Sequence, residues 1–186
     1  MSDMFTMPEI SRTKMMTIAA LCVAMAFVLN QISLYRMPMG GSITPFSMLF
    51  IVLAGFWLGP VWGIMAGVAM GLLNTVTGAY VVHPLQYILD YILGFGALGL
   101  SGFFRKMKFG DLHIGLHIGC IVGIMGRFVM VFLSGYFFFY MWAGDRHPAL
   151  YSFLYNITYI GPELIATLIV ISIPVVYNAI KRLQPN

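Results

Sequence analysis

The 186-residue sequence is 60% hydrophobic and only 9% charged, with a mean hydropathy of +0.90. Soluble domains carry about 25% charged residues, so this composition excludes a soluble globular protein, which could not bury so much apolar surface. The net charge of +4 comes from cations that flank apolar segments, which argues against a nucleic-acid partner. The sequence therefore predicts an all-α integral membrane protein, one domain over residues 1–186, whose surroundings are the lipid bilayer.

Apolar segments separated by short polar stretches give the predicted membrane spans in chain order. A crossing needs about 20 residues, so the chain has room for a bundle of about six transmembrane helices. Gly59-Pro60 divides one apolar stretch into two short segments, because proline disrupts the helix that precedes it. The predicted spans are residues 15–34, 46–58, 62–76, 82–104, 112–142 and 151–180.

Clusters of cations predict the orientation. With six spans, the cations before the first span, after the fourth and after the sixth all fall on one side of the membrane. Cytoplasmic loops carry an excess of Lys and Arg, so this side is predicted to be cytoplasmic, with both termini there and the protein in the cell membrane. These cations are Arg12, Lys14, Arg105, Lys106, Lys108, Lys181 and Arg182.

Three charged residues lie inside the predicted spans: Asp90, Arg127 and Glu163. A charge at the centre of a membrane helix costs about 2.5–3.5 kcal/mol, so such a residue faces the bundle interior and has a partner or a ligand. One interpretation is an ion pair of Arg127 with Asp90 or Glu163 that holds helices together. Another is a polar binding cavity open to the outside. A third is an ion or proton relay in a carrier that works alone.

Aromatic residues gather near the same outer ends of the spans. An aromatic belt at the membrane interface accounts for single rings. It does not account for the pattern Tyr-x3-Tyr-Asn-x2-Tyr, which places polar tips on adjacent helical faces. Aromatic faces beside a carboxylate suit a flat, cationic heteroaromatic ligand. The residues concerned are Tyr80, Tyr87, Tyr91, 136–140, Trp142, Tyr151, Tyr155, Asn156 and Tyr159.

Small residues recur at helical spacing in two spans. Ala20 and Ala24 are four apart in the first span, and Gly63, Gly67 and Gly71 form a ridge in the third. Small-x3-small spacing lets two helices approach closely. For the alanines, packing within the bundle and contact with another protein both stay open. For the glycines, an internal packing face is the simpler interpretation.

Other chemistries find little support in the sequence. His113 and His117 share a helical face, as a haem or metal site requires, but His83 and His147 fall in outer loops and complete no second pair. No phosphate-binding loop with Gly-Lys-Ser/Thr is present, and no nucleophile lies at a convincing spacing from a base. We therefore predict no metal, no cofactor and no enzymatic activity.

Three motifs carry a resemblance to a known family. They are MPMGGS at 37–42, HPLQYILDY at 83–91 and YSFLYNITY at 151–159. In order and spacing the chain resembles the thiamine-specific S-components of energy-coupling factor transporters. The resemblance implies a six-helix membrane subunit that captures thiamine from outside the cell. Its implied partners are a transmembrane coupling subunit and two cytoplasmic ATPases.

The resemblance also implies which residues bind. Asp90 matches the family's acidic ligand contact, which is often a glutamate, and would accept hydrogen bonds from an aminopyrimidine. Phe139 falls near a stacking tryptophan of the family, with Trp142 as a rival. Ala20 and Ala24 resemble the small-residue face offered to the coupling subunit. The full set of implied binding residues is Asp90, Tyr91, Tyr80, Arg127, Gly135, Phe139, Tyr151 and Asn156.

Two features depart from the family pattern. Val131 stands where relatives carry a histidine, four residues after the basic residue of the fifth span. The acidic and tryptophan contacts of the family's first loop have no clear equivalent in residues 37–47. The implied ligand is therefore thiamine, or else a thiamine precursor or related aromatic heterocycle. Arg127 is expected to balance the charge of Asp90 or to hold a loop.

Overall fold

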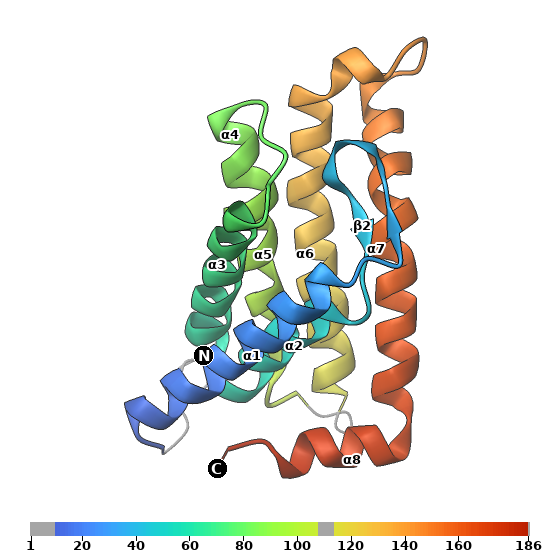
Figure 1. The fold of residues 1–186 in the computed structure, drawn as a ribbon. Coiled ribbons are helices and arrows are strands. Elements are labelled where there is room, and N and C mark those ends of the chain that lie inside the picture. Colours follow the sequence, from blue (N-terminus) through green and yellow to red (C-terminus); the bar gives the residue numbers. More distant parts are fainter. Residues whose placement is uncertain (1–9, 108–113, 186) are drawn as a thin grey trace.

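A computed structural model describes residues 10–107 and 114–185. The chain folds into a bundle of helices with one small two-stranded sheet (Figure 1). The α-helices are α1 (Arg12–Gln31), α2 (Ser47–Leu58), α3 (Pro60–Val76), α4 (Pro84–Tyr87), α5 (Gly94–Ala97), α6 (Gly115–Phe138), α7 (Pro148–Ser172) and α8 (Pro174–Arg182). The remaining elements are η2 (Pro38–Gly40), η3 (Ile88–Leu93), η4 (Leu98–Phe104), η5 (Tyr140–Trp142), β1 (Tyr35–Arg36) and β2 (Ser42–Ile43).

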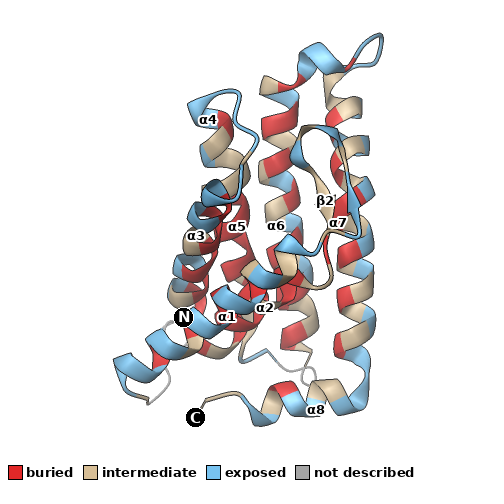
Figure 2. Cartoon of the chain, viewed as in Figure 1, coloured by how far each residue is buried: buried red, intermediate tan, exposed pale blue. Residues whose placement is uncertain are grey.

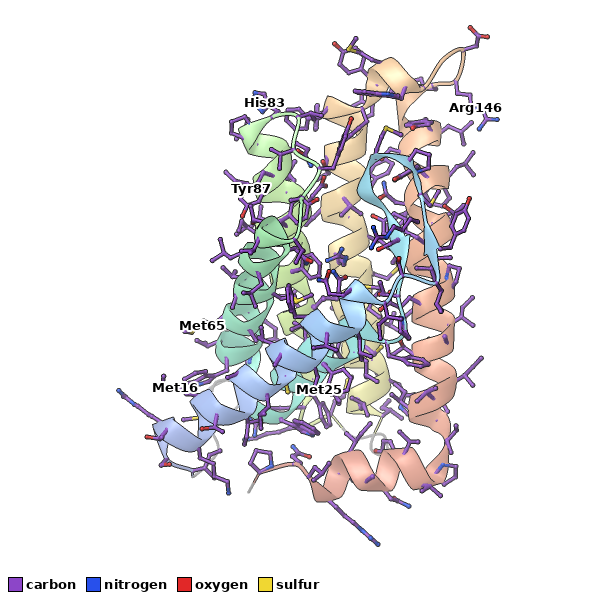
Figure 3. The ribbon with its side chains drawn as sticks, in the orientation of Figure 1. Met16, Met25, Met65, His83, Tyr87 and Arg146 are labelled. Atoms are coloured by element: carbon purple, nitrogen blue, oxygen red, sulfur yellow. The ribbon has the colours of Figure 1, made fainter. Side chains whose placement is uncertain are left out.

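The bundle has the dimensions of a membrane protein. Four helical stretches are long and apolar enough to cross a membrane: Arg12–Gln31, Pro84–Phe104, Gly115–Phe138 and Pro148–Ser172. The shorter apolar helices α2 and α3 accompany them. Met16, Met25 and Met65 are more than 45% exposed and point away from the bundle (Figure 3). An apolar outer surface of this kind suits contact with lipid, so the predicted all-α membrane fold is confirmed.

The last predicted span does not continue as one helix. Residues 151–180 were expected to form a single segment, but α7 ends at Ser172 and α8 begins at Pro174. Ile173 between them has an extended backbone (ψ 121°), because the residue before a proline avoids the helical region. α8 then turns across the end of the bundle (Figure 1), where Trp57 Nε1 donates to the Ile180 carbonyl at 3.1 Å.

The fifth and fourth spans also differ in detail from the prediction. α6 ends at Phe138, and the short helix η5 carries the chain on to Trp142. The predicted start at 112 lies outside the described residues, as do Lys108 and His113. The fourth span is not a regular α-helix, because η3 is a π segment and η4 is a 3₁₀ segment. A π segment inside a helix is common where a protein builds a functional site.

Glycines bring α2, α3 and the fourth span into direct backbone contact. A Cβ atom added at Gly63 would lie 2.5 Å from the Gly55 Cα, so no side chain fits there. Gly67 and Gly71 face the backbone of Phe95 and Tyr91 in the same way. The predicted glycine ridge is therefore an internal packing face. Figure 2 shows the buried residues on the inward sides of the helices, with α5 buried throughout.

A loop of residues 32–46 joins α1 to α2 and lies beside α7 (Figure 1). Its two short strands pair antiparallel, with Tyr35 opposite Ile43 and Arg36 opposite Ser42. The tip between them turns through Met39 (φ +64°) and Gly40 (φ +96°), both in the left-handed region. We call residues 32–46 the α1–α2 loop. It forms one wall of the cavity described next.

Candidate functional site

A cavity of about 250 Å³ opens between α3, η3, α6 and α7, beside the α1–α2 loop. Its volume lies just below the range that is usual for small-molecule sites, about 300–1,000 Å³. All of the predicted binding residues line it, although they come from separate parts of the sequence. These are Tyr80, Asp90, Tyr91, Arg127, Gly135, Phe139, Tyr151 and Asn156.

Asp90 is held from one side only. Its Oδ2 atom accepts a hydrogen bond of 2.5 Å from Gln86 Nε2, while its Oδ1 atom is buried without a partner. Gln86, only 1% exposed, also donates to the Tyr80 carbonyl at 3.2 Å and accepts from the Val82 amide at 3.1 Å. Sequence reasoning missed Gln86, although its spacing of four residues from Asp90 on a helix was a usable signal. The free oxygen of Asp90 leaves an acceptor available to a ligand.

Arg127 lies in α6 with its guanidinium group over an aromatic ring. Its Cζ atom is 3.6 Å from the centroid of the Phe95 ring, a cation–π contact. Its Nε and Nη1 atoms are buried without a hydrogen-bond partner, and within residues 10–107 and 114–185 no ion pair joins Arg127 to Asp90 or Glu163. The interpretation of these charges as an ion pair that holds helices together is therefore wrong. Arg127 keeps N–H donors for another group.

Glu163, the third charged residue, is 3% exposed and also lines the cavity. Its Oε2 atom accepts from Thr44 Oγ1 at 2.9 Å. Its Oε1 atom accepts from Ser47 Oγ at 3.2 Å and from the Met48 backbone amide at 3.0 Å. The carboxylate of α7 is therefore bound to the beginning of α2, a long-range contact that no local sequence pattern indicated.

Aromatic rings flank the cavity. Tyr80 and Phe139 stack with centroids 6.1 Å apart, and the Tyr91 hydroxyl accepts from the Tyr80 amide at 3.0 Å. On the α7 side Tyr151 and Tyr155 stack at 6.1 Å. Phe139 lines the cavity itself, while Trp142 packs behind it with centroids 5.6 Å apart. Of the two candidates for a stacking residue, the geometry favours Phe139.

Asn156 and Gly135 join α6 to α7 beside the cavity. The Asn156 amide nitrogen donates to the Ser152 carbonyl at 2.8 Å and to the Val131 carbonyl at 3.3 Å. The Asn156 Oδ1 atom accepts from the Tyr159 hydroxyl at 2.8 Å. Gly135 is required for this approach, because a Cβ there would overlap the Ser152 side chain. Both residues line the cavity, and Asn156 already has protein partners on both ends of its amide.

Two further polar groups of the cavity were not among the predicted residues. Ser134 Oγ and Asn74 Nδ2 are buried without a hydrogen-bond partner. Ser134 lies seven residues after Arg127, on the same face of α6, and that spacing could have revealed it. Asn74 was visible as an amide inside an apolar segment. Buried polar atoms without partners require water or a ligand group, so they add to the polar character of the site.

The α1–α2 loop is attached to α7 at its tip. The Tyr155 hydroxyl accepts from the Gly41 amide at 3.1 Å and donates to the Pro38 carbonyl. Thr158 Oγ1 lies 3.2 Å from the Met37 sulfur. Together with the contacts of Glu163 at the base of the loop, these interactions hold the loop against α7 beside the cavity. Met37, Gly41 and Thr44 of this loop line the cavity.

The remaining predicted features lie outside the cavity. Ala20 and Ala24 are exposed on α1, while Ala19 and Ala26 are buried in the bundle. Packing inside the bundle therefore uses the second pair, and the predicted contact residues are free on the outer surface. His117 lies 3.2 Å from Ser172 Oγ. Among the described residues, no group of three or more His, Cys, Asp or Glu side chains could hold a metal ion.

The fold and the cavity define the class of protein. A helical membrane bundle around an internal polar and aromatic cavity is a membrane protein built to hold a small molecule. The chain belongs to the thiamine transporter family, because residues 16–183 match the family described as "Thiamine transporter protein (Thia_YuaJ)".

Individual relatives agree with this assignment. The chain is 33% identical over 169 residues to the thiamine transporter ThiT of Bacillus subtilis, covering 82% of this chain and 85% of that protein. It is 26% identical over 132 residues to ThiT of Lacticaseibacillus paracasei, covering 65% of this chain and 64% of that protein. A solved structure of ThiT from Listeria monocytogenes has a TM-score of 0.79 and 26% identity, covering 91% of this chain and 97% of that one.

Proposed function

We propose that this chain is the substrate-binding membrane subunit of an energy-coupling factor transporter and that it captures thiamine, or a thiamine precursor, from outside the cell. The observation that carries the proposal is the free, buried Oδ1 atom of Asp90 in an aromatic-walled cavity. Thiamine combines a cationic thiazolium ring with an aminopyrimidine. Its charge and its amino group both suit a carboxylate, and its flat rings suit stacking. The names of the curated relatives support the same ligand.

In this proposal each wall of the cavity has a role. Asp90 accepts a hydrogen bond from the aminopyrimidine and offsets the cationic charge, while Tyr80, Tyr91 and Phe139 form the aromatic wall. Tyr151 forms the opposite wall on α7. Arg127, whose Nε and Nη1 atoms have no hydrogen-bond partner, donates to an acceptor atom of the ligand. Asn156 and Gly135 set the distance between α6 and α7, and therefore the width of the site.

The proposed partners are a transmembrane coupling subunit and two ATPases on the cytoplasmic side. Ala20 and Ala24 support a partner contact, because they present small side chains on the exposed face of α1. The start of α1 and the whole of α8 lie toward the same end of the bundle (Figure 1). The basic residues near them support a cytoplasmic position for this end in the cell membrane.

The direct test is ligand binding by the purified protein in detergent, without ATP or an ion gradient. Thiamine, its phosphates and its pyrimidine precursor are titrated while tryptophan fluorescence is recorded. We expect quenching by thiamine at micromolar concentration or below, since Trp142 packs against Phe139 of the cavity wall. No response to thiamine at micromolar concentration contradicts the proposed ligand. A stronger response to the precursor identifies that compound as the ligand instead.

The partner contact has its own test. Ala20→Leu and Ala24→Leu add bulk to the exposed face of α1, so we expect uptake by cells that express the coupling and ATPase subunits to fall at least tenfold. Thiamine binding by the purified variants is expected to stay at the wild-type level. Ile169→Leu, at a position 62% exposed on α7, is the matched control. Normal uptake by both alanine variants contradicts the proposed contact.

A further inference from the structure

We propose that Glu163 is a positioning residue that keeps the α1–α2 loop closed over the cavity and so sets how long a bound ligand stays. The identity of the ligand as thiamine rests on the proposed function. The attachment of the loop to α7 rests instead on the hydrogen bonds described above. The argument begins with the first turn of α2, where the backbone needs a hydrogen-bond acceptor that its own sequence does not supply.

The beginning of α2 lacks a local cap. The first N–H groups of a helix have no partner inside the helix, and a Ser, Thr, Asp or Asn at the N-cap position usually accepts from them. Here the N-cap residue is Phe46, in the left-handed conformation (φ +60°) and without a side-chain hydrogen bond. Glu163 of α7 takes this role, because its carboxylate accepts from the Met48 amide at 3.0 Å. A negative charge at a helix N-terminus is also favoured by the helix dipole.

The same carboxylate holds the end of the loop. Thr44 Oγ1 donates to it at 2.9 Å and Ser47 Oγ at 3.2 Å, and the two hydroxyls lie 2.7 Å apart. Thr44, Ser47 and Glu163 are all less than 5% exposed. A buried carboxylate is tolerated only when hydrogen bonds replace its hydration. The two hydroxyls and the Met48 amide are the three donors that provide this replacement. If the loop moves away from α7, the carboxylate loses the Thr44 donor and keeps only Ser47 and Met48, which belong to α2.

The loop is therefore attached to one face of α7 at two points. Tyr155 holds the tip through Pro38 and Gly41, and Glu163, two turns further along α7, holds the base. Residues eight apart on an α-helix lie on the same side. Thr44, Glu163 and Tyr155 also line the cavity, so both attachments border the space that a ligand occupies. Opening the cavity toward this side requires that these hydrogen bonds break.

The expected consequence concerns release more than capture. Weakening the attachment favours the open loop, through which a bound ligand leaves, while a ligand that arrives needs the open loop in any case. Differences between related complexes generally appear in the dissociation rate. We therefore expect that loss of the Glu163 attachment accelerates ligand release.

The test compares Glu163→Gln, Thr44→Val and the double variant. Hydrogen exchange of the backbone amides in residues 32–46 is measured without ligand, and release of labelled thiamine is followed after excess unlabelled thiamine is added. We expect faster exchange in the loop and roughly tenfold faster release in each single variant, a factor that corresponds to about 1.4 kcal/mol. The double variant should release ligand no faster than Glu163→Gln, because Thr44 is the loop residue that donates to Glu163 and the two substitutions act on that one contact. Thr167→Val, one turn beyond Glu163 and outside the cavity lining, is the matched control and should behave as wild type.

Three results would overturn the proposal. Loop exchange at the wild-type rate in both single variants means that Glu163 does not hold the loop. Faster release in Glu163→Gln alone, with unchanged release in Thr44→Val, means that Glu163 contacts the ligand directly. Effects that add in the double variant mean that the two residues act separately.

If wild-type protein binds no thiamine, the proposed ligand fails, while the exchange experiment still decides the role of Glu163. Thr44→Val alone decides it through loop exchange if Glu163→Gln does not fold.

Discussion

Two regions of the bundle are joined in different ways. In the glycine-packed region, formed by α2, α3, α5 and η4, backbones touch at Gly55, Gly63, Gly67 and Gly99. In the cavity region, α6, α7 and the α1–α2 loop are joined by hydrogen bonds of single side chains. Backbone contacts leave no room to adjust, whereas a single hydrogen bond contributes only about 1 kcal/mol and breaks easily. A cavity that admits and releases a ligand needs walls joined by single hydrogen bonds that can break. It also needs a rigid region, here the one with backbone contacts, to support those walls.

The glycine-packed region should be the less tolerant of the two. A Cβ at Gly67 would overlap the Phe95 backbone carbonyl, and a backbone neighbour cannot turn aside as a side chain can. We expect Gly67→Ala to destabilise the protein by about 3 kcal/mol, which lowers the melting temperature in detergent by about 6–12 °C. Gly96→Ala is the matched control, because the nearest atom to its Cβ would be a side-chain carbon at 3.5 Å. Equal melting temperatures for the two variants would remove the distinction between the regions.

In the cavity region, Asp90→Asn should affect binding without loss of stability. Loss of a charged acceptor weakens a hydrogen bond to the ligand by about 1.5–3 kcal/mol, so thiamine affinity should fall about 10- to 100-fold. The ligand-free protein should melt at the same or a higher temperature, because the buried Oδ1 atom has no partner and asparagine carries no charge to bury. Titration and thermal melting measure the two effects. Asp145→Asn in an exposed loop is the control, and unchanged affinity in Asp90→Asn would refute the proposed role.

A single hydroxyl at the loop tip should have a smaller effect. Tyr155→Phe keeps the ring and removes both hydrogen bonds to the loop, at Pro38 and at Gly41. We expect a loss of about 1 kcal/mol, equivalent to about fivefold weaker thiamine binding, and faster exchange of the Gly41 amide. Tyr140→Phe, at a position 56% exposed at the start of η5, serves as the control. Gly41 exchange at the wild-type rate would show that the hydroxyl does not hold the tip.

The far end of the bundle should be independent of the cavity. Trp57→Phe removes the indole N–H that donates to the Ile180 carbonyl of α8. Amides of α8 should then exchange faster, while thiamine affinity stays within about twofold of wild type, because distant sites without shared partners behave independently. Trp62→Phe on α3 controls for the loss of an indole. A clear loss of affinity in Trp57→Phe alone would show that α8 and the cavity are coupled.

Much of this architecture could be predicted from the sequence. Long apolar stretches place the helices, and costly polar residues such as Asp90 and Arg127 face the interior because lipid excludes them. Every predicted binding residue therefore reached the same cavity. Ile173-Pro174 also carried a local signal, since the residue before proline leaves the helical region, and the prediction of one continuous span overlooked it.

What could not be predicted depends on how helices are rotated against one another. Arg127 lies in α6 and Glu163 in α7, and their opposite charges suggested an ion pair. In the structure Arg127 faces the Phe95 ring and Glu163 faces the first turn of α2. The sequence near Phe46 does not say which distant residue caps that turn. Partners of this kind follow from packing, which local periodicity does not describe.

The π segment η3 has a consequence for how this chain is aligned with others. A π turn holds one more residue than an α turn and behaves as a one-residue insertion within the helix. Deleting one residue from 88–93 would restore a regular α-helix while shortening the span by only about 1.5 Å. Because the wide π turn absorbs the extra residue, the residues before it, including Gln86, would keep their orientation relative to Gly94 and the residues after it. A one-residue gap at this place in an alignment therefore marks the loss of the wide turn that contains Asp90, while the residues on either side keep their faces of the helix.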